Sequence, residues 1–167
     1  SKLRYRLPHM EHPEASFRKD YDKIAFGQVI SASLTELMTT VCAIARGGEA
    51  IELHCIQKHP EDVERWRVCS KDVADKLSKY MLEVARPGGT AYSVYNGMVA
   101  WPSKTGSAEV AGAKKTDAWF VGFAPAGKPK VAFVVWVEED GTGSNMAKQI
   151  GLVSLVKDAL SAVEASQ

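Results

Sequence analysis

The apolar run KVAFVVWVE, residues 130–138, restricts the fold more than any other segment of the chain. The side chains that would point to each face of a strand are apolar, which is typical of a central strand covered on both sides. A second strand pattern, DAWFVGF (117–123), precedes it, and the linker APAGKP (124–129) is short enough for a hairpin. The two patterns predict the middle of an antiparallel sheet, with Trp119, Phe120 and Trp136 in its core because aromatic residues favour strands.

Helical patterns occur before and after these strands. One is expected over 33–48, where Ser33 and Glu36 form a capping box and a glycine pair ends the helix. Another is expected over 70–89, opened by Ser70, and a third over 145–165. The apolar faces expected to turn inward are Leu34, Leu37, Val41, Ile44 and Ala45; Val73, Leu77, Met81 and Val84; and Ile150, Val153, Val156, Leu160 and Val163.

The remaining segments complete an α/β chain of the α+β type. A short strand is expected over 50–56, a polar connection over 57–69, and a strand over 98–101 that runs on into 104–110. This order predicts an antiparallel sheet with helices packed on it. The polar, proline-broken segment 1–22 is expected to be an irregular extension, and 23–167 to be one domain.

Composition excludes some classes of protein. The formal net charge is +1, with 25% charged residues, so the basic excess typical of nucleic-acid binding is absent. No apolar run approaches the roughly 18 residues that a membrane-spanning helix needs. We therefore expect no nucleic-acid partner and no membrane span within this sequence.

Histidines and cysteines give no recognised metal-site spacing. Cys42, Cys55 and Cys69 are odd in number and lack CxxC spacing, so neither a disulfide framework nor a zinc ribbon is predicted, and small buried side chains are expected. A metal site built from His9 and His12, or from His54, Cys55 and His59, is the alternative interpretation. We expect surface histidines, no metal and no cofactor.

The stretch VAWPSKTGSAEV, residues 99–110, places Lys104, Thr105, Gly106 and Ser107 side by side at the start of the strands. A cation and two hydroxyls offer charge-assisted hydrogen bonds to a carboxylate. Glycine lets another backbone come close. The stretch therefore predicts one wall of an anion-binding cleft.

These residues carry a family resemblance. KTGSAEV, TDAWFVGFAPAGKPKVAFVVWVEE and GTGSNMAKQI resemble, in order, the C-terminal run of high-molecular-weight penicillin-binding protein transpeptidases, which belong to the serine β-lactamase superfamily. IAFGQVISASLTELMTTVCAIARGG and ARPGGTA resemble the segments upstream of that run, so the resemblance covers about 23–160. The departures from the family pattern are Ser33-Leu34 for Thr-Pro, Arg46 for Asn, Ser103 for Gly and Glu109 for Gln.

The resemblance implies roles for the four residues. Lys104 would supply positive potential for the substrate carboxylate and bond toward the serine of an S-x-N motif. The hydroxyls of Thr105 and Ser107 would hold the carboxylate, and the backbone N–H of Ser107 would be one of two oxyanion donors. Gly106 would let the substrate lie along the strand.

The serine nucleophile of that family is not identified. S-x-x-K occurs at Ser16–Lys19 and at Ser154–Lys157, but thirteen serines and fourteen lysines produce about one such match by chance. S-x-N does not occur between Ser16 and Lys104. We expect the nucleophile, its lysine and the S-x-N loop in an upstream segment of the same domain, and either that segment or self-association to cover the exposed sheet.

By resemblance, the complete domain would cross-link peptidoglycan stem peptides ending in D-Ala-D-Ala and bind β-lactams. It would act outside the cytoplasm, anchored through an upstream segment. An inactive transpeptidase-like binding or scaffold module is the alternative. The glycine-rich DGTGSN (140–145) lacks the lysine of a phosphate-binding loop, so we expect a turn before a helix.

Overall fold

The computed structural model describes residues 32–56, 58–95, 100–109, 114–138 and 141–166. These residues belong almost entirely to one compact unit, Leu34–Gln167. The predicted extension 1–22 and its boundary with the following domain lie outside the described residues.

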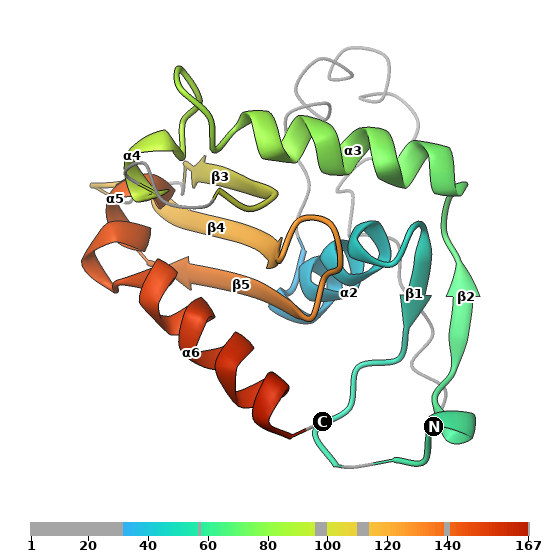
Figure 1. Cartoon of the computed structure of the whole chain (residues 1–167). Helices are drawn as coiled ribbons and strands as arrows, with labels where there is room; N and C mark the ends of the chain where they lie inside the picture. The colour runs from blue at the N-terminus through green and yellow to red at the C-terminus, as the bar shows by residue number, and fades with distance from the viewer. Residues whose placement is uncertain (1–31, 57, 96–99, 110–113, 139–140, 167) are drawn as a thin grey trace. The chain divides into compact units, whose positions relative to one another are not determined.

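Three antiparallel strands form the main sheet (Figure 1): β3 (Ser103–Ala108), β4 (Asp117–Ala124) and β5 (Val131–Val137). Phe120 of β4 pairs with Thr105 on one side and Val135 on the other. Ala124 pairs with Val131, which closes the predicted β4–β5 hairpin. The hairpin prediction is therefore confirmed.

The prediction that 130–138 is the central strand is wrong for the described sheet. Its order is β3-β4-β5, so β4 is in the middle and β5 at an edge. A strand that is apolar on both faces is expected to be covered on both faces. The same pattern does not indicate whether the strand pairs with a neighbour on one edge or on both. Accordingly, Phe120 and Phe123 of β4 are buried, whereas Trp136 of β5 is 39% exposed.

Helices lie on both faces of this sheet, as the apolar pattern on both faces of 130–138 predicted. They are α2 (Leu34–Ala45), α3 (Lys71–Glu83), α4 (Tyr92–Tyr95), α5 (Gly143–Gln149) and α6 (Leu152–Ala165). Phe120 packs in the cluster that includes residues of α5 and α6. Phe123 is three residues further along the strand and so faces the other side, where it lines a pocket with Ile44 of α2.

The core lies between the sheet and α4, α5 and α6. Its buried members are Ala85, Ala91, Val94, Tyr95, Trp101, Ala118, Phe120, Ala124, Phe133, Met146, Ala147, Leu152, Val153 and Val156. The rings of Phe120 and Phe133 stack with centroids 6.1 Å apart, across the β4–β5 pairing. This cluster fixes the position of β4, on which β3 depends.

The single C-terminal helix predicted over 145–165 is two helices. Gly151 adopts a left-handed conformation with φ +62°, which ends α5 and precedes α6. Val153 and Val156 are buried as expected, but Ile150 lies at the break and is 39% exposed. The apolar spacing continues across the glycine, so periodicity alone merges the two helices.

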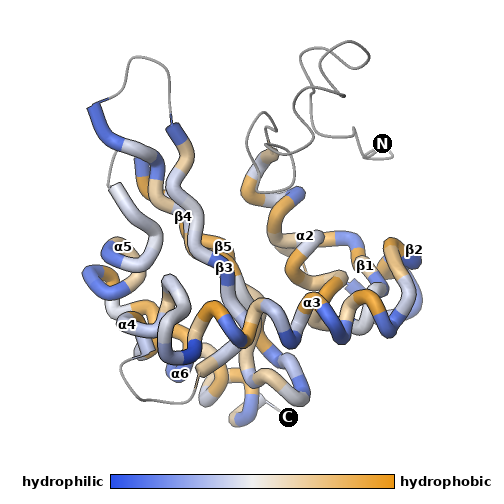
Figure 2. Tube along the Cα trace, turned by 90° about the horizontal axis from the view of Figure 1, so that it is seen from above, coloured by the Kyte–Doolittle hydropathy of each residue, from blue (hydrophilic) through white to orange (hydrophobic). Residues whose placement is uncertain are grey.

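Helix α3 begins as predicted, because the hydroxyl of Ser70 accepts a hydrogen bond from the N–H of Val73. Its packing differs from the prediction. Ala74 is buried, whereas Val73 and Leu77 are 46% and 39% exposed, and apolar and polar residues alternate along the helix (Figure 2). A small residue allows the helix to approach its neighbours closely, which leaves the larger apolar side chains at the margin of the contact.

Some other side chains expected inside are outside. Leu34, the first residue of α2, is 46% exposed, and Cys55 is exposed. Trp136 is anchored at the surface because its indole N–H donates to the carboxylate of Asp117, 3.0 Å away. Trp119 is half-buried, so Phe120 alone of the three predicted aromatic residues lies fully in the core.

The strand predicted over 50–56 is shorter and lies in a separate two-stranded sheet. Strand β1 (Glu49–Ile51) pairs antiparallel with β2 (Arg65–Arg67). The region 57–69, predicted to be only a polar connection, therefore contains β2, and a short 3-10 helix at Pro60–Asp62. Alternation over three residues is too short to identify a strand such as β2.

Residues 52–64, described except for residue 57, form a closed excursion from this small sheet. The N–H of Glu52 donates to the carbonyl of Glu64 over 2.9 Å, directly beyond the β1–β2 pairs. Most described side chains within the excursion are exposed. Its two ends are therefore held together while the rest of it contributes little to the core.

Candidate active site

The four predicted wall residues lie together on β3, at one edge of the main sheet (Figure 1). Lys104 and Ser107 are exposed, and Thr105 and Gly106 are half-buried. Within the described ranges, β3 pairs with β4 and with no other strand. Its outer edge is therefore placed where an extended chain can add to it.

The strand begins later than predicted. Residues 98 and 99 lie outside the described part of the chain, and residues 100–102 precede β3 without belonging to it. A short helix, α4, which the sequence pattern did not predict, stands before this segment. Tyr95, at the end of α4, and Trp101 are both buried, so packing rather than strand pairing leads the chain into β3.

Gly106 lies close to the side chain of the residue paired with it on β4. A Cβ atom there would lie 3.1 Å from the Cβ of Trp119, the residue paired with it. Behind the same pair, α5 begins at Gly143, where a Cβ would lie 1.9 Å from the carbonyl oxygen of Trp119 and 3.1 Å from that of Gly106. The site strand is thus supported by backbone-to-backbone packing.

Lys104 brings a positive charge to the edge. Its ammonium donates to the carbonyl oxygen of Thr105 on its own strand. Among the ion pairs found in the described residues, none includes Lys104. Its charge is therefore not matched by a carboxylate there, which favours an anion at this edge.

Thr105 has a partner that the sequence analysis did not identify. Its hydroxyl lies 2.7 Å from the hydroxyl of Thr90, and either oxygen can be the donor. Thr90 belongs to the ARPGGTA segment, which sequence similarity connected to the family without assigning a role. Because the two residues are fifteen positions apart, only the folded chain shows the contact.

Tyr95 supports the start of the strand from behind. Its hydroxyl donates to the carbonyl of Trp101 over 3.3 Å, and the two rings meet edge to face with centroids 5.8 Å apart. Burial raises the pKa of Tyr95 above its ordinary value of 10.0. The tyrosine is therefore held as the neutral phenol.

This burial predicts a difference between Tyr95→Phe and the parent chain in alkali. Because the pKa of Tyr95 is higher in the folded chain than in the unfolded chain, the unfolded tyrosine ionises first as the pH rises. The contribution of Tyr95 to the free energy of unfolding is therefore complete below pH 10 and declines as the pH rises through and above that value. Urea unfolding at a series of pH values from 8 to 11 should show a steeper loss for the parent. Tyr80→Phe, at a residue 68% exposed, should keep the parent slope. Equal slopes for Tyr95→Phe and the parent would contradict this account.

The structure places one S-x-x-K match and not the other. Ser154 and Lys157 are exposed on α6, which contacts β5, the strand at the opposite edge of the described sheet from β3. Ser16 and Lys19 lie outside the described residues. The described chain therefore does not bring Ser154 to the Lys104–Ser107 strand.

The alternative metal ligands are not gathered in the described part of the chain. His54, Cys55 and His59 are each exposed, and His9 and His12 lie outside the described residues. No group of three potential ligand side chains is close enough there to hold a metal ion. Likewise, none of the described helices is long and apolar enough to cross a bilayer.

Within the glycine-rich stretch 140–145, Gly141 and Thr142 precede α5, and the helix begins at Gly143, earlier than the predicted start at residue 145. Gly141 has φ +89°, and its N–H donates to the carbonyl of Thr116 over 3.0 Å. The hydroxyl of Thr116 donates back to the carbonyl of Gly141. Residue 140 lies outside the described chain.

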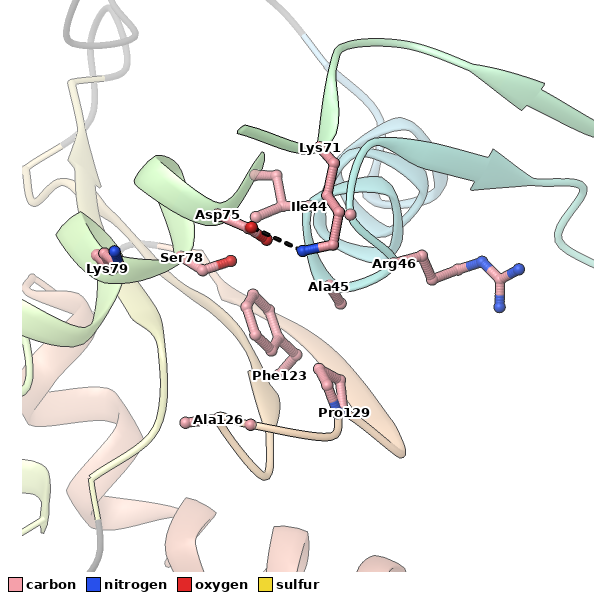
Figure 3. A pocket seen from close by; sticks show the side chains of 12 residues that line it. Ile44, Ala45, Arg46, Lys71, Asp75, Ser78, Lys79, Phe123, Ala126 and Pro129 are labelled. Carbon is pink, nitrogen blue, oxygen red and sulfur yellow. Dashed lines mark hydrogen bonds and ion pairs between the residues drawn. The ribbon is translucent and has the colours of Figure 1, made fainter. Parts of the chain in front are cut away.

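A pocket of about 460 Å³ lies away from β3, between α2, α3 and the β4–β5 turn (Figure 3). Phe123 stands in its middle, and Lys71 and Asp75 point toward each other at its side, 2.7 Å apart. Arg46, at another side, pairs with Glu49 over 2.7 Å. These two cations are matched by carboxylates, whereas Lys79, which also lines the pocket, is in none of the ion pairs found in the described residues.

Comparisons with known proteins agree with this geometry. The model of the penicillin binding protein transpeptidase domain family matches residues 11–155. A search of curated proteins finds no match.

Solved structures match over most of the chain. A peptidoglycan glycosyltransferase from Burkholderia ambifaria is 24% identical with a TM-score of 0.73, covering 88% of this chain and 46% of that one. The transpeptidase domain of Burkholderia pseudomallei penicillin-binding protein 3 is 26% identical with a TM-score of 0.71, covering 87% and 47%. Penicillin-binding protein PBP2 of Helicobacter pylori, solved in complex with MreC, is 23% identical with a TM-score of 0.74, covering 98% and 32%.

The fold is thus that of a penicillin-binding protein transpeptidase domain. Since the family model matches far more than half of the sequence, the chain belongs to the penicillin-binding protein transpeptidase domain family. It spans less than half the length of the solved structures described above, which fits the C-terminal portion predicted from sequence.

Proposed function

We propose that this chain is the C-terminal part of a peptidoglycan D,D-transpeptidase and that β3 binds the terminal carboxylate of a stem peptide ending in D-Ala-D-Ala. The observation that carries the proposal is the position of Lys104, Thr105, Gly106 and Ser107 on an edge strand. An edge strand with a cation and two hydroxyls suits an extended, anionic peptide.

Each residue has a distinct role in this proposal. Lys104 attracts the carboxylate, and the hydroxyls of Thr105 and Ser107 donate to it. Gly106 leaves space for the peptide backbone. The N–H of Ser107 is one donor to the oxyanion, which forms when a nucleophile attacks the penultimate carbonyl carbon; a donor of this kind contributes about 3 kcal/mol in acyl transfer.

The nucleophile comes from an upstream segment of the domain carrying S-x-x-K and S-x-N. Its serine oxygen bonds to the carbonyl carbon, the peptide bond to the last D-Ala breaks, and that residue leaves with the proton as the free amino acid. The amine of a neighbouring stem then attacks the acyl-serine and restores the serine, forming the cross-link. β-Lactams bind along the same strand and acylate the same serine. The reaction takes place outside the cytoplasm, and an upstream segment anchors the protein to the membrane.

Incubation with benzylpenicillin tests where the nucleophile lies. Intact-mass measurement of this chain should show no adduct, because neither Ser16 nor Ser154 serves as the nucleophile. A stoichiometric adduct that maps to Ser16 would place the nucleophile in this chain and refute the upstream assignment.

Peptide binding tests β3 itself. In NMR titration, N-acetyl-D-Ala-D-Ala should shift the amide signals of Thr105, Gly106 and Ser107, and Lys104→Ala should weaken binding about tenfold, the loss of one charge-assisted hydrogen bond. Lys128→Ala, which removes the same charge from the exposed β4–β5 turn, should bind like the parent. Absence of binding by the parent, or equal loss in both variants, would count against β3 as the carboxylate site.

A further inference from the structure

We propose that Thr90 is a positioning residue that orients the hydroxyl of Thr105 for donation to the substrate carboxylate. The role in substrate binding rests on the proposed function, whereas the orientation of the hydroxyl is a property of this chain alone. The contact that carries the inference joins the two side-chain oxygens, 2.7 Å apart.

The turn before α4 holds Thr90 firmly. Gly88 has φ +90°, a conformation that favours glycine. Gly89 lies directly against the end of α3, since a Cβ there would be 2.2 Å from the carbonyl oxygen of Val84. On the other side of Thr90, Ala91 is buried and its N–H donates to the same carbonyl over 2.9 Å. Thr90 is thus presented to β3 from a backbone fixed on both sides.

The side chain of Thr105 is less restricted than the backbone around Thr90. It is half-buried on an edge strand, and its neighbours Lys104 and Ser107 are exposed. A threonine in a strand has more than one accessible χ1 rotamer, and a partner for its hydroxyl selects among them. Thr90 supplies that partner.

The hydroxyl pair also sets the direction of donation. In the free chain either oxygen can donate. A carboxylate accepts hydrogen bonds and cannot donate them when ionised, so a bound carboxylate requires the proton of Thr105. Thr90 then donates to Thr105, and Thr105 donates to the carboxylate. Hydrogen bonds in such a chain polarise one another, which strengthens the terminal one.

The hydrogen bond between Thr90 and Thr105 is expected to matter for the orientation of a hydroxyl more than for the stability of the fold. Thr90 is exposed and Thr105 half-buried, so water can satisfy both hydroxyls if the pair is broken. A pair of this kind contributes little to folding. What it determines is where the Thr105 proton points.

The test measures the Thr105 rotamer in the full chain. Three-bond couplings from the backbone nitrogen and carbonyl carbon to Cγ2 of Thr105 should indicate one χ1 rotamer in the parent. Thr90→Val keeps the shape of the side chain but removes its hydroxyl, so the couplings should become averaged. Thr90→Ser restores the hydroxyl and should restore one rotamer. Thr40→Val, at an exposed threonine of α2, is the matched control and should leave the couplings unchanged.

Titration with N-acetyl-D-Ala-D-Ala separates the two proposals. Thr90→Val should bind about fivefold more weakly than the parent, and Thr90→Ser about equally, as expected for one ordinary hydrogen bond. A single unchanged Thr105 rotamer in Thr90→Val, or averaging in Thr90→Ser as well, would overturn the positioning role. If the rotamer responds as expected but the parent does not bind the peptide, the positioning role stands and the proposed function fails.

Discussion

Replacing Gly143 with alanine should destabilise the chain by about 3 kcal/mol or more, the upper range for added atoms in a packed site. The new Cβ would lie 1.9 Å from the carbonyl oxygen of Trp119, and backbone in the middle of a sheet cannot give way as a side chain can. In an unstrained helix the same change would stabilise by up to about 1 kcal/mol through a less flexible unfolded chain. The close contact therefore reverses the usual sign.

Urea unfolding followed by tryptophan fluorescence measures this effect. Gly127→Ala is the matched control, because a Cβ at Gly127 in the β4–β5 turn meets no atom within 4 Å. The control should stay within about 0.5 kcal/mol of the parent. If Gly143→Ala were as stable as the parent, the start of α5 could not lie directly against β3 and β4.

Replacing Phe120 with alanine should cost about 4 kcal/mol, which is typical of removing a fully buried aromatic side chain. Phe120 is fully buried, stacks on Phe133, and pairs in register with Thr105. Its loss leaves a cavity under the middle strand, at the level of the proposed carboxylate site. Because native domains are stable by only about 5–15 kcal/mol, this change approaches the limit of folding.

The expected result can be checked by denaturation and by proteolysis of the same samples. Leu155→Ala, at a residue 55% exposed on α6, is the matched control and should change stability by less than about 0.5 kcal/mol. A small effect of Phe120→Ala, similar to that of Leu155→Ala, would show that the core is centred elsewhere. In that case β3 would not depend on the β4–β5 hairpin for its position.

The sequence predicted the elements that have a clear period or a clear end signal. The β4–β5 hairpin followed from two apolar runs and a short linker, and the start of α3 from Ser70. Contacts between helices and strands were harder to predict from the sequence. The apolar spacing on α3 does not show that Ala74, rather than Leu77, faces the interior, because that depends on how closely a neighbouring element approaches. The break at Gly151 is similar, since glycine is also tolerated within helices.

The candidate site also contains residues that the sequence identified and one that it did not. Lys104, Thr105, Gly106 and Ser107 are consecutive, so their side chains and spacing could be recognised directly. Thr90 could not be recognised, because its contact with Thr105 requires a double-glycine turn packed against the end of α3. Nothing in the local pattern around Thr90 indicates which strand its hydroxyl reaches.

The closed excursion 52–64 has a practical consequence for protein engineering. Its ends are joined by the β1–β2 pairs and by the Glu52–Glu64 hydrogen bond, so a change in its length does not pull on α2 or α3. A fluorescent protein, an affinity peptide or a cross-linking residue inserted among its exposed described positions would be attached through two short, paired strands. Such a graft would report on the assembly of this domain without touching the strand on which the proposed chemistry depends.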